Sequence, residues 1–308
     1  MNKFSEGIAD GRIGLLGNPS DIYGGRCISF TFDKTASVTV SDSENWEITN
    51  EWEGTERQLE YNGKNDLVKA ILRKLSVQHP LKIEYQSEIP IGVGLAGSSA
   101  IIIATIKALN RHFKMGMDLS DIAELALHTE VDELRITAGF QDRYTISHGG
   151  LLYMDFKGKE YMRKTDPPAT LKIYSPLKIP CFLAIGKSKK SSSTIHNPLR
   201  EKFLSGDNSV KKSMDEIACT ADKGLFYLLR ENWSDLGKVM NANHNLRRQI
   251  GAFFPPDEEI INYALSLGAL GAKSAGSGGA VLVLSEDLKV KERMSERYEC
   301  FVPRMTRK

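Results

Sequence analysis

The sequence predicts a protein of mixed strands and helices, divided into two domains. Stretches of alternating apolar residues, typical of strands, are interspersed with stretches whose apolar residues recur with the period of an amphipathic helix. Prolines break the chain at residues 166–168 and again between 174 and 180, so we expect one domain over 1–177 and another over 178–308. A chain of 308 residues is long enough for each domain to bury its own core.

The first domain alternates between the two kinds of element. We expect an apolar strand that ends at the turn formers of residues 17–21, strands over 27–32 and 36–40 with a turn at Asp33 and Lys34, a helix over 65–78, a strand over 81–85, a helix over 98–112, a helix from 118 to about 130 or 133 that is capped by Asp118 or Ser120, and a strand over 151–156. The polar stretch 42–62, with Trp46 and Trp52, is expected to be a hairpin or an exposed excursion; it could form a nucleotide-base pocket or only a loop.

The second domain is dominated by helical patterns. We expect a buried strand over 181–185, helices over 208–230, 234–249 and 257–267, a strand over 281–284, a helix over 287–297 and a short strand over 300–302. A basic, serine-rich loop at 187–197 fits a lid over a phosphorylated ligand and a plain flexible loop equally well.

Composition and charge exclude several classes of function. The net charge of +2 gives no reason to expect nucleic acid or a membrane surface as a partner. No run approaches the roughly 18 apolar residues of a membrane span, and the polar start of the chain is not followed by a signal-type apolar core. Cys27, Cys181, Cys219 and Cys300 are scattered, so we expect four buried, reduced thiols in a cytoplasmic protein. Nothing in the sequence indicates an oligomeric state.

The stretch most indicative of chemistry is residues 90–100, PIGVGLAGSSA, between a predicted strand and a predicted helix. Its glycines permit close approach of a ligand to the backbone, and Ser98 and Ser99 fall where the helix begins. Free N–H groups and the helix dipole favour an anion there, which predicts a phosphate site. A tight turn capped by serine is the alternative.

Two common nucleotide motifs fit this stretch poorly. Gly92, Gly94 and Gly97 have the spacing of a dinucleotide-binding loop, but the acidic residue expected about 20 positions later should end a second strand, whereas Asp118 opens a helix. The Walker loop is excluded because no lysine precedes the two serines.

Other polar positions are candidates for a site. Glu130 falls near the C-terminal end of its predicted helix, where the dipole disfavours an acid, so a cation could compensate it unless it is exposed. Asp142 stands beside Arg143, which would keep a base or metal ligand ionised; a surface ion pair is the alternative. On the helix over 234–249, one polar face is either exposed or part of a site: Asn241, His244, Asn245 and Arg248.

Three motifs in order resemble those of the GHMP small-molecule kinases. Residues 90–100 resemble the phosphate loop P-x-x-x-G-L-G-S-S-A, with Ala96 as a one-residue insertion; residues 11–21 resemble the N-terminal sugar motif, and residues 271–279 the C-terminal glycine loop. Within that family, residues 14–21, 138–143, 152–156 and 243–248 match glucuronokinases most closely. Asn18 and Pro19 replace the Glu-His of galactokinases, while Ala275 and Ala280 depart from the usual threonine and glycine.

The resemblance implies a fold and a reaction. The fold is the two-domain α+β GHMP fold, with a ribosomal S5 domain 2-like N-terminal domain, a ferredoxin-like C-terminal domain and the active site in the cleft between them. The reaction is transfer of the γ-phosphoryl group of ATP, with Mg²⁺, to the anomeric hydroxyl of D-glucuronate. Alternatives are a heptose phosphate, galacturonate or a hexose as substrate, or a non-catalytic sugar-binding protein.

The resemblance also assigns roles. Asp142 matches the catalytic aspartate and Arg12 the arginine that supports it, while Ser99 and Glu130 match the magnesium ligands. The expected ATP-phosphate ligands are Gly92, Gly94, Leu95, Ala96, Gly97, Ser98, Ser99 and Ala100. The expected substrate ligands are Asn18, Asp21, Gly276 and Ser277, with Arg143, Arg247 and Arg248, and Arg200 behind them, as candidate partners of a uronate carboxylate.

Overall fold

The computed structural model describes residues 4–136, 139–159, 168–187, 199 and 201–306. They form two compact units, each made of three segments. Unit 1 comprises Met1–Gly11, Lys34–Ile89 and Ala96–His148, and unit 2 comprises Arg12–Asp33, Pro90–Leu95 and Gly149–Lys308. The division predicted at residues 177 and 178 stays a prediction. None of the described helices combines the length and apolar character that a membrane span requires.

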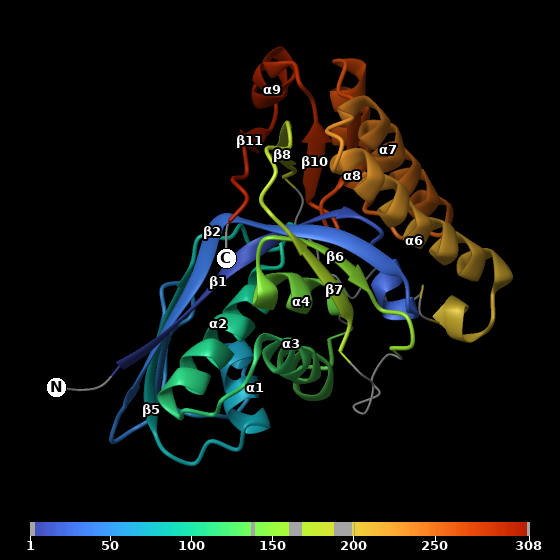
Figure 1. Ribbon diagram of the computed structural model, residues 1–308. Helices are drawn as coiled ribbons and strands as arrows, with labels where there is room; N and C mark the ends of the chain where they lie inside the picture. Colours follow the sequence, from blue (N-terminus) through green and yellow to red (C-terminus); the bar gives the residue numbers. More distant parts are fainter. Residues whose placement is uncertain (1–3, 137–138, 160–167, 188–198, 200, 307–308) are drawn as a thin grey trace. The chain divides into compact units, whose positions relative to one another are not determined.

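Unit 1 is a sheet covered on one face by helices. Its strands are β3 (Glu47–Asn50), β4 (Gly54–Glu56), β5 (Leu81–Ser87) and parts of the long β1 (Phe4–Leu16) and β2 (Arg26–Asp42). The covering helices are α1 (Asp66–Lys74), α2 (Gly97–His112), α3 (Leu119–His128) and α4 (Phe140–His148), which lie together on the same side of these strands (Figure 1). The hairpin predicted around the tryptophans is confirmed, because β3 and β4 pair antiparallel.

The helices of unit 1 follow the apolar pattern closely. α2 and α3 begin and end within a few residues of prediction, and Asp118 caps α3 through the N–H groups of Ser120 and Asp121. A π-helical turn, η2 (Thr129–Glu133), continues α3. α1 is shorter than predicted, because it begins after Asn65, whose φ of 55° is left-handed, and ends at Lys74.

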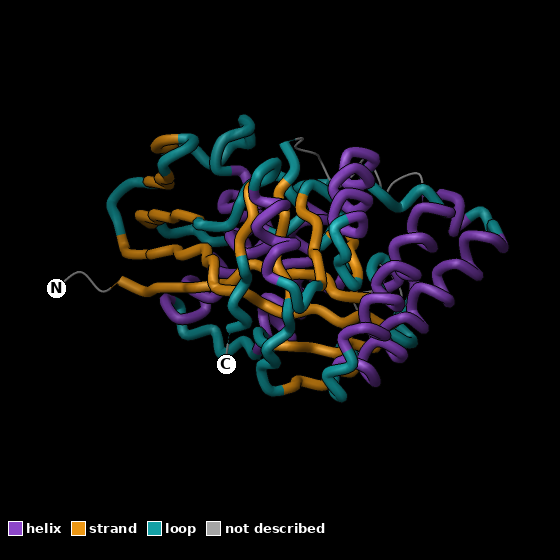
Figure 2. The backbone as a smooth tube through the Cα atoms, turned by 90° about the horizontal axis from the view of Figure 1, so that it is seen from above, coloured by secondary structure: helices purple, strands orange, loops and turns teal. Residues whose placement is uncertain are grey.

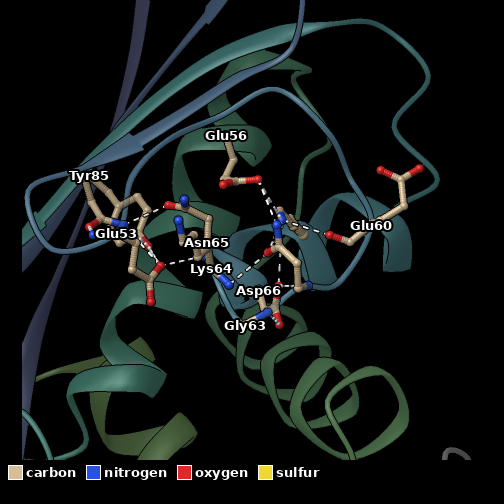
Figure 3. Close-up of polar contacts among 11 residues, drawn as sticks. Glu53, Glu56, Glu60, Gly63, Lys64, Asn65, Asp66 and Tyr85 are labelled. Carbon is tan, nitrogen blue, oxygen red and sulfur yellow. Dashed lines mark hydrogen bonds and ion pairs between the residues drawn. The ribbon is translucent and has the colours of Figure 1, made fainter.

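The connection between β4 and α1 is held by polar side chains around a fully buried lysine. Lys69 Nζ donates to Glu60 O at 2.9 Å and Asn62 Oδ1 at 3.0 Å, and it pairs with carboxylates of Glu56 and Asp66 at 3.7 and 3.8 Å. Figure 3 shows Glu56 and Asp66 in this connection, with dashed lines for its hydrogen bonds and ion pairs. The buried charge of Lys69 is therefore compensated locally.

Unit 2 contains the other pairings of β2 and a second sheet. The N-terminal half of β2 pairs antiparallel with β6 (Leu151–Asp155), which pairs with β7 (Thr170–Tyr174). The second sheet is antiparallel, in the order β11 (Glu299–Phe301), β8 (Cys181–Ile185), β10 (Ala280–Leu284) and β9 (Gly271–Ser274).

Four helices accompany the second sheet. They are α6 (Asn208–Leu228), α7 (Trp233–Gln249), α8 (Pro255–Ser266) and α9 (Leu288–Ser295), and all four confirm predicted helices. α6 and α7 lie side by side, as the two neighbouring long helices at the right of Figure 2. α8 and α9 share one apolar core with the sheet, built from side chains such as Phe182, Ile261 and Val283.

Three sequence predictions are wrong. Asp33 and Lys34 do not form a turn, because β2 runs through them; the Asp33 N–H donates to Arg304 O and its Oδ1 accepts from the N–H of Arg304, near the other end of the chain. Residues 271–274 were assigned to a glycine loop but form β9, paired with β10. The expectation of four buried thiols fails for Cys219, which is exposed, and for Cys300, which is half-buried.

Candidate active site

The glycine-rich stretch 90–100 connects β5 to α2, as the sequence predicts. Its backbone is left-handed at Gly92, Gly94 and Ala96, with φ values of 74°, 76° and 60°. Alanine rarely adopts that conformation, so the loop holds Ala96 in a strained backbone geometry of the kind that clusters at functional sites.

Ala96 is also the N-cap of α2, and it supplies no side-chain hydrogen bond to the helix. The predicted alternative of a serine-capped turn is therefore not what the structure shows. The N–H groups of the first turn belong to Gly97, Ser98 and Ser99, and they lie at the positive end of a 16-residue helix. This end of α2 is suited to an anion such as a phosphate.

In unit 1, two predicted metal ligands lie side by side. Ser99 in the first turn of α2 donates its hydroxyl to Glu130 Oε1 at 3.0 Å, and both side chains are buried. Glu130 stands in the π-helical turn after α3, an irregularity often found at functional sites. A hydroxyl and a carboxylate at this spacing are hard oxygen donors, so this pair fits Mg²⁺ chemically.

Of the two alternatives left open for Glu130, the structure shows a compensating cation, the side chain of Arg143. The Arg143 guanidinium forms a buried ion pair with Glu130 Oε2 and donates to Gly139 O at 2.7 Å. Its Nη1 also lies 3.7 Å from Asp142 Oδ2. Arg143 thus links the two acidic residues that were predicted as metal ligand and base.

Asp142 lies in the first turn of α4, next to the buried arginine. Its side chain is 20% exposed, which leaves it accessible while Glu130 is not. Its Oδ1 accepts a hydrogen bond from the Gln141 amide at 3.4 Å. A carboxylate that is partly exposed and near a guanidinium has the surroundings that a general base needs.

In unit 2, Arg12 holds both glycine loops. Its Nη1 donates to Gly94 O at 2.9 Å and to Ala275 O at 3.1 Å, and its backbone N–H donates to Leu95 O. The loops approach so closely that a Cβ on Gly94 would lie 2.9 Å from Gly278 O, and one on Gly276 would lie 2.1 Å from Gly94 O. Glycine at these positions thus lets the two loops approach each other, while the predicted approach of a ligand to the backbone stays a prediction.

Two predicted substrate ligands follow β1 directly. Asn18 and Asp21 are both buried, and Asp21 lies in the short helix η1 (Ser20–Tyr23). Asn18 Oδ1 accepts a hydrogen bond from Lys273 Nζ at 3.3 Å. Asp21 lies close enough to Cys27 for its carboxylate to contribute, after burial, to raising the pKa of that thiol.

The arginines proposed for a carboxylate differ in their surroundings. Arg247 is buried on α7 and donates to three carbonyls, of Ala252 at 3.0 Å, Ser274 at 3.4 Å and Gly276 at 2.8 Å. Burial lowers the pKa of Arg247 to about 10. Arg248 is 56% exposed and lies 3.8 Å from Glu258. Arg200 and most of the basic loop 187–197 fall outside the described residues.

The residues on the polar face of α7 lie in different surroundings. His244 is buried and bonded to Glu258 Oε1 at 2.8 Å, whereas Asn241 donates to Leu270 O and accepts from the N–H of Ala272. Both residues thus connect α7 to its neighbours, while Asn245 is exposed.

Two residues of this region were missed by sequence reasoning. Asp257 is buried in the first turn of α8 and accepts from Ser274 Oγ at 2.5 Å and from the N–H of Gly279 at 2.9 Å. Lys273 is fully buried on β9. An acid near the start of a helix, such as Asp257, is commonly explained by the helix dipole. A lysine in a glycine-rich stretch, such as Lys273, is commonly exposed, so neither residue stood out in the sequence as a candidate for the site.

Sequence models of a known family match both halves of the chain. The GHMP kinases N terminal domain matches residues 64–150, and the GHMP kinases C terminal domain matches residues 225–303. The matches include α1, the phosphate loop, Glu130 and Asp142 in the first case and the C-terminal glycine loop in the second.

Comparisons with individual proteins lead to the same family. The chain is 32% identical to Glucuronokinase 1 and 34% identical to Probable glucuronokinase 2, both of Arabidopsis thaliana, over 88% of its own length and 82% of theirs. Its fold is similar to that of a Lactococcus lactis galactokinase complexed with galactose, with a TM-score of 0.81, 15% identity and coverage of 98% of this chain and 94% of that one. The protein belongs to the GHMP kinase family and has its two-domain fold. Kinases of this family use ATP as the phosphoryl donor.

Proposed function

We propose that the protein is an ATP-dependent sugar kinase that phosphorylates the anomeric hydroxyl of D-glucuronate, giving glucuronate 1-phosphate in the cytoplasm. The observation that carries this proposal is its similarity to two proteins named as glucuronokinases over 88% of the chain. The buried positive charges of Arg12, Arg247 and Lys273 beside the C-terminal glycine loop support an anionic substrate.

The proposed roles follow from the geometry within each unit. Asp142 accepts the proton of the attacking hydroxyl, and the Arg143 guanidinium lies 3.7 Å from that carboxylate. The N-terminal turn of α2 binds phosphate oxygens through its free N–H groups, with Ser99 and Glu130 holding Mg²⁺. Mg²⁺ supplies charge neutralisation for the transferring group. Arg12 adds positive charge and holds the glycine loops that approach the substrate.

The structure favours one arginine for the carboxylate of the sugar. Arg143 and Arg247 are buried and are held by a carboxylate or by carbonyls of the protein, whereas Arg248, which lies 3.8 Å from Glu258, is more than half exposed. We therefore propose Arg248 as the partner of the uronate carboxylate, with Asn18, Asp21, Gly276 and Ser277 binding the rest of the sugar. The planar fork of arginine matches a carboxylate in two hydrogen bonds.

A substrate panel tests the proposal. ADP release is measured with D-glucuronate, D-galacturonate, D-glucose, D-galactose and a heptose 7-phosphate, and the position of the phosphate is read by ³¹P NMR. Turnover is expected to be highest for D-glucuronate, with an anomeric phosphate as product. Turnover of the heptose phosphate with none on either uronate would overturn the assignment.

The base assignment has its own test. Asp142→Asn keeps the size of the side chain but removes the proton acceptor, so kcat is expected to fall about 1,000-fold. The affinity for ATP, measured by calorimetry, is expected to stay within about threefold of the original, because no phosphate ligand is changed. A kcat within tenfold of the original would exclude Asp142 as the base.

A further inference from the structure

Lys273 is a buried cation whose partners include no carboxylate. Its ammonium group is fully buried and donates to Gly14 O at 3.1 Å, Asn18 Oδ1 at 3.3 Å and Ser274 O at 2.8 Å. Over the described ranges of the chain, no ion pair to an acidic side chain is found for it. Its three donors thus match three neutral oxygen acceptors.

Keeping a positive charge at this position is costly. Burial, together with the neighbouring charges of Arg247 and Arg12, lowers the pKa of Lys273 well below its ordinary 10.5. A methionine would fill similar space without a desolvation cost. The hydrogen bonds of Lys273 therefore have to offset that cost. The groups that accept these hydrogen bonds indicate the role of the residue.

Each acceptor belongs to a different functional segment. Gly14 is near the end of β1, Asn18 lies in the turn that follows, and Ser274 ends β9, directly before the glycines of the C-terminal loop. Arg247 and Arg12 extend the same arrangement, since they bind the carbonyls of Gly276 and Ala275. Three successive carbonyls, of residues 274 to 276, are thus turned toward buried cations.

The bond to Asn18 also fixes the orientation of its amide. Because Oδ1 accepts from Lys273, the Nδ2 donors are on the other branch of the amide and are directed away from the ammonium. Asn18 then offers hydrogen-bond donors, which suit the hydroxyl and carboxylate oxygens of a sugar acid. An amide with the opposite orientation would present an acceptor instead.

We propose that Lys273 is a positioning residue of the phosphoryl-transfer reaction, which fixes the amide of Asn18 and the carbonyls of the C-terminal glycine loop in one arrangement. This inference rests on the proposed sugar-binding role of Asn18 and of that loop. Lys273 acts through these groups and makes no contact with the reacting atoms itself.

Hydrogen exchange tests the arrangement without any substrate. Lys273→Met is expected to speed amide exchange about tenfold in peptides covering 14–20 and 274–280, where Gly14 N–H bonds to Ala275 O and Ala275 N–H to Ala280 O. Lys69→Met is the control, because Lys69 is equally buried and donates to one carbonyl and one asparagine Oδ1, where Lys273 donates to two carbonyls and one asparagine Oδ1. Its effect should be confined to residues 56–69. Unchanged exchange at 14–20 and 274–280 in Lys273→Met would overturn the proposal, as would a uniform increase over unit 2.

Kinetics test the link to the sugar. With ATP and D-glucuronate, Lys273→Met is expected to raise KM for the sugar about tenfold or more while KM for ATP changes less than about threefold. Combining it with Asn18→Ala should add little to the loss caused by Asn18→Ala alone, because both changes remove the same oriented amide. Multiplicative losses would contradict the proposal. Lys273→Arg, which keeps a cationic donor, should recover part of the sugar affinity.

A second variant covers the case in which Lys273→Met does not fold. Asn18→Asp places a carboxylate against Lys273 and removes the donors of the amide, so the melting temperature should rise while KM for D-glucuronate increases. A lower melting temperature would show that Lys273 does not face this side chain and would overturn the proposal. If the unmodified enzyme fails to phosphorylate D-glucuronate, the proposed substrate is wrong, and the exchange and melting measurements still decide the role of Lys273.

Discussion

The two units of the molecule compensate their buried charges in different ways. In unit 1, Lys69 is surrounded by carboxylates, and Arg143 forms a buried ion pair with Glu130 (Figure 3 shows the surroundings of the first). In unit 2, Lys273, Arg247 and Arg12 donate mainly to main-chain carbonyls. Carbonyl dipoles satisfy the donors of a cation but do not cancel its charge; the buried Asp257, bonded to Ser274 and Gly279, is an acidic neighbour that acts on Arg247.

This difference has a functional consequence. Cations that are held mainly by carbonyls keep their charge, so a region that contains them attracts an anion more strongly than a region whose buried cations are paired with carboxylates. The contrast therefore supports the proposal that the C-terminal glycine loop belongs to the part of the enzyme that meets an acidic sugar. It also predicts that charge-removing substitutions in the two units have different effects.

The largest loss of stability is expected in unit 1, from Glu130→Ala. The substitution leaves the buried Arg143 without its carboxylate, which typically costs about 3–5 kcal/mol. Urea unfolding measures the change, and Glu130→Ala combined with Arg143→Met is the control, since removing both charges should restore much of the loss. A decrease below about 1 kcal/mol would mean that this pair is not compensated as the comparison requires.

In unit 2, Arg247→Met is expected to cost less, about 2 kcal/mol, because losing three hydrogen bonds to carbonyls is partly offset by removing a desolvated charge. KM should rise for a neutral sugar as well as for D-glucuronate, because the substitution loosens the glycine loop that either sugar would meet, and it should rise more for D-glucuronate, because a buried positive charge is removed as well. A loss confined to the acid sugar would show that Arg247 binds the carboxylate directly.

A smaller and more selective effect is expected from Arg248→Gln. An exposed arginine contributes little to stability, so unfolding free energy should change by less than about 0.5 kcal/mol. KM for D-glucuronate should rise about tenfold, because losing one solvent-exposed charged interaction costs about 1.4 kcal/mol of binding free energy. KM for D-glucose should not change. Arg248→Lys is the matched control and should retain part of the affinity. An equal effect on both sugars would remove Arg248 as the carboxylate partner.

Local patterns in the sequence predicted the helices well and the long-range pairings poorly. The apolar period of α6, α7 and α8 depends only on neighbouring residues, so these helices begin and end close to prediction. The continuity of β2 through Asp33 depends on pairing with Arg304, about 270 residues later, which no local pattern records. β9 was missed because its glycine-rich start looks like a loop until β10 pairs with it.

The site shows the same division. The conflict between Glu130 and the helix dipole left a compensating cation and surface exposure both open, and the family resemblance pointed to Mg²⁺ as that cation; the structure buries Glu130 and pairs it with Arg143. The resemblance to the family identified Ser99, and the structure places its hydroxyl against Glu130. Lys273 gave no signal, because its burial depends on β1 and on the turn at Asn18, which are far from it in the sequence.

The smallest expected effect is on the pH dependence of stability and involves His244, which is bonded to Glu258 and lies near Arg247 and Lys273. Burial lowers the pKa of His244 below its ordinary 6.5; the charges of Arg247 and Lys273 act in the same direction, and the hydrogen bond to Glu258 opposes them. Above pH 6.5 the histidine is neutral in both states and its contribution to stability is complete. As the pH falls below that value, the unfolded chain takes up a proton that the folded protein resists, so stability decreases until the folded histidine is also protonated.

His244→Gln removes this titration while keeping an amide donor for Glu258. The variant should therefore lose less unfolding free energy between pH 7.5 and pH 5 than the unmodified protein, as measured by urea unfolding at each pH. His112, which is also bonded to a carboxylate but lies in unit 1, provides the control, because His112→Gln should leave the contribution of His244 unchanged. If His244→Gln instead steepens the decrease, the folded protein prefers the charged histidine, and Glu258 outweighs the neighbouring cations of unit 2.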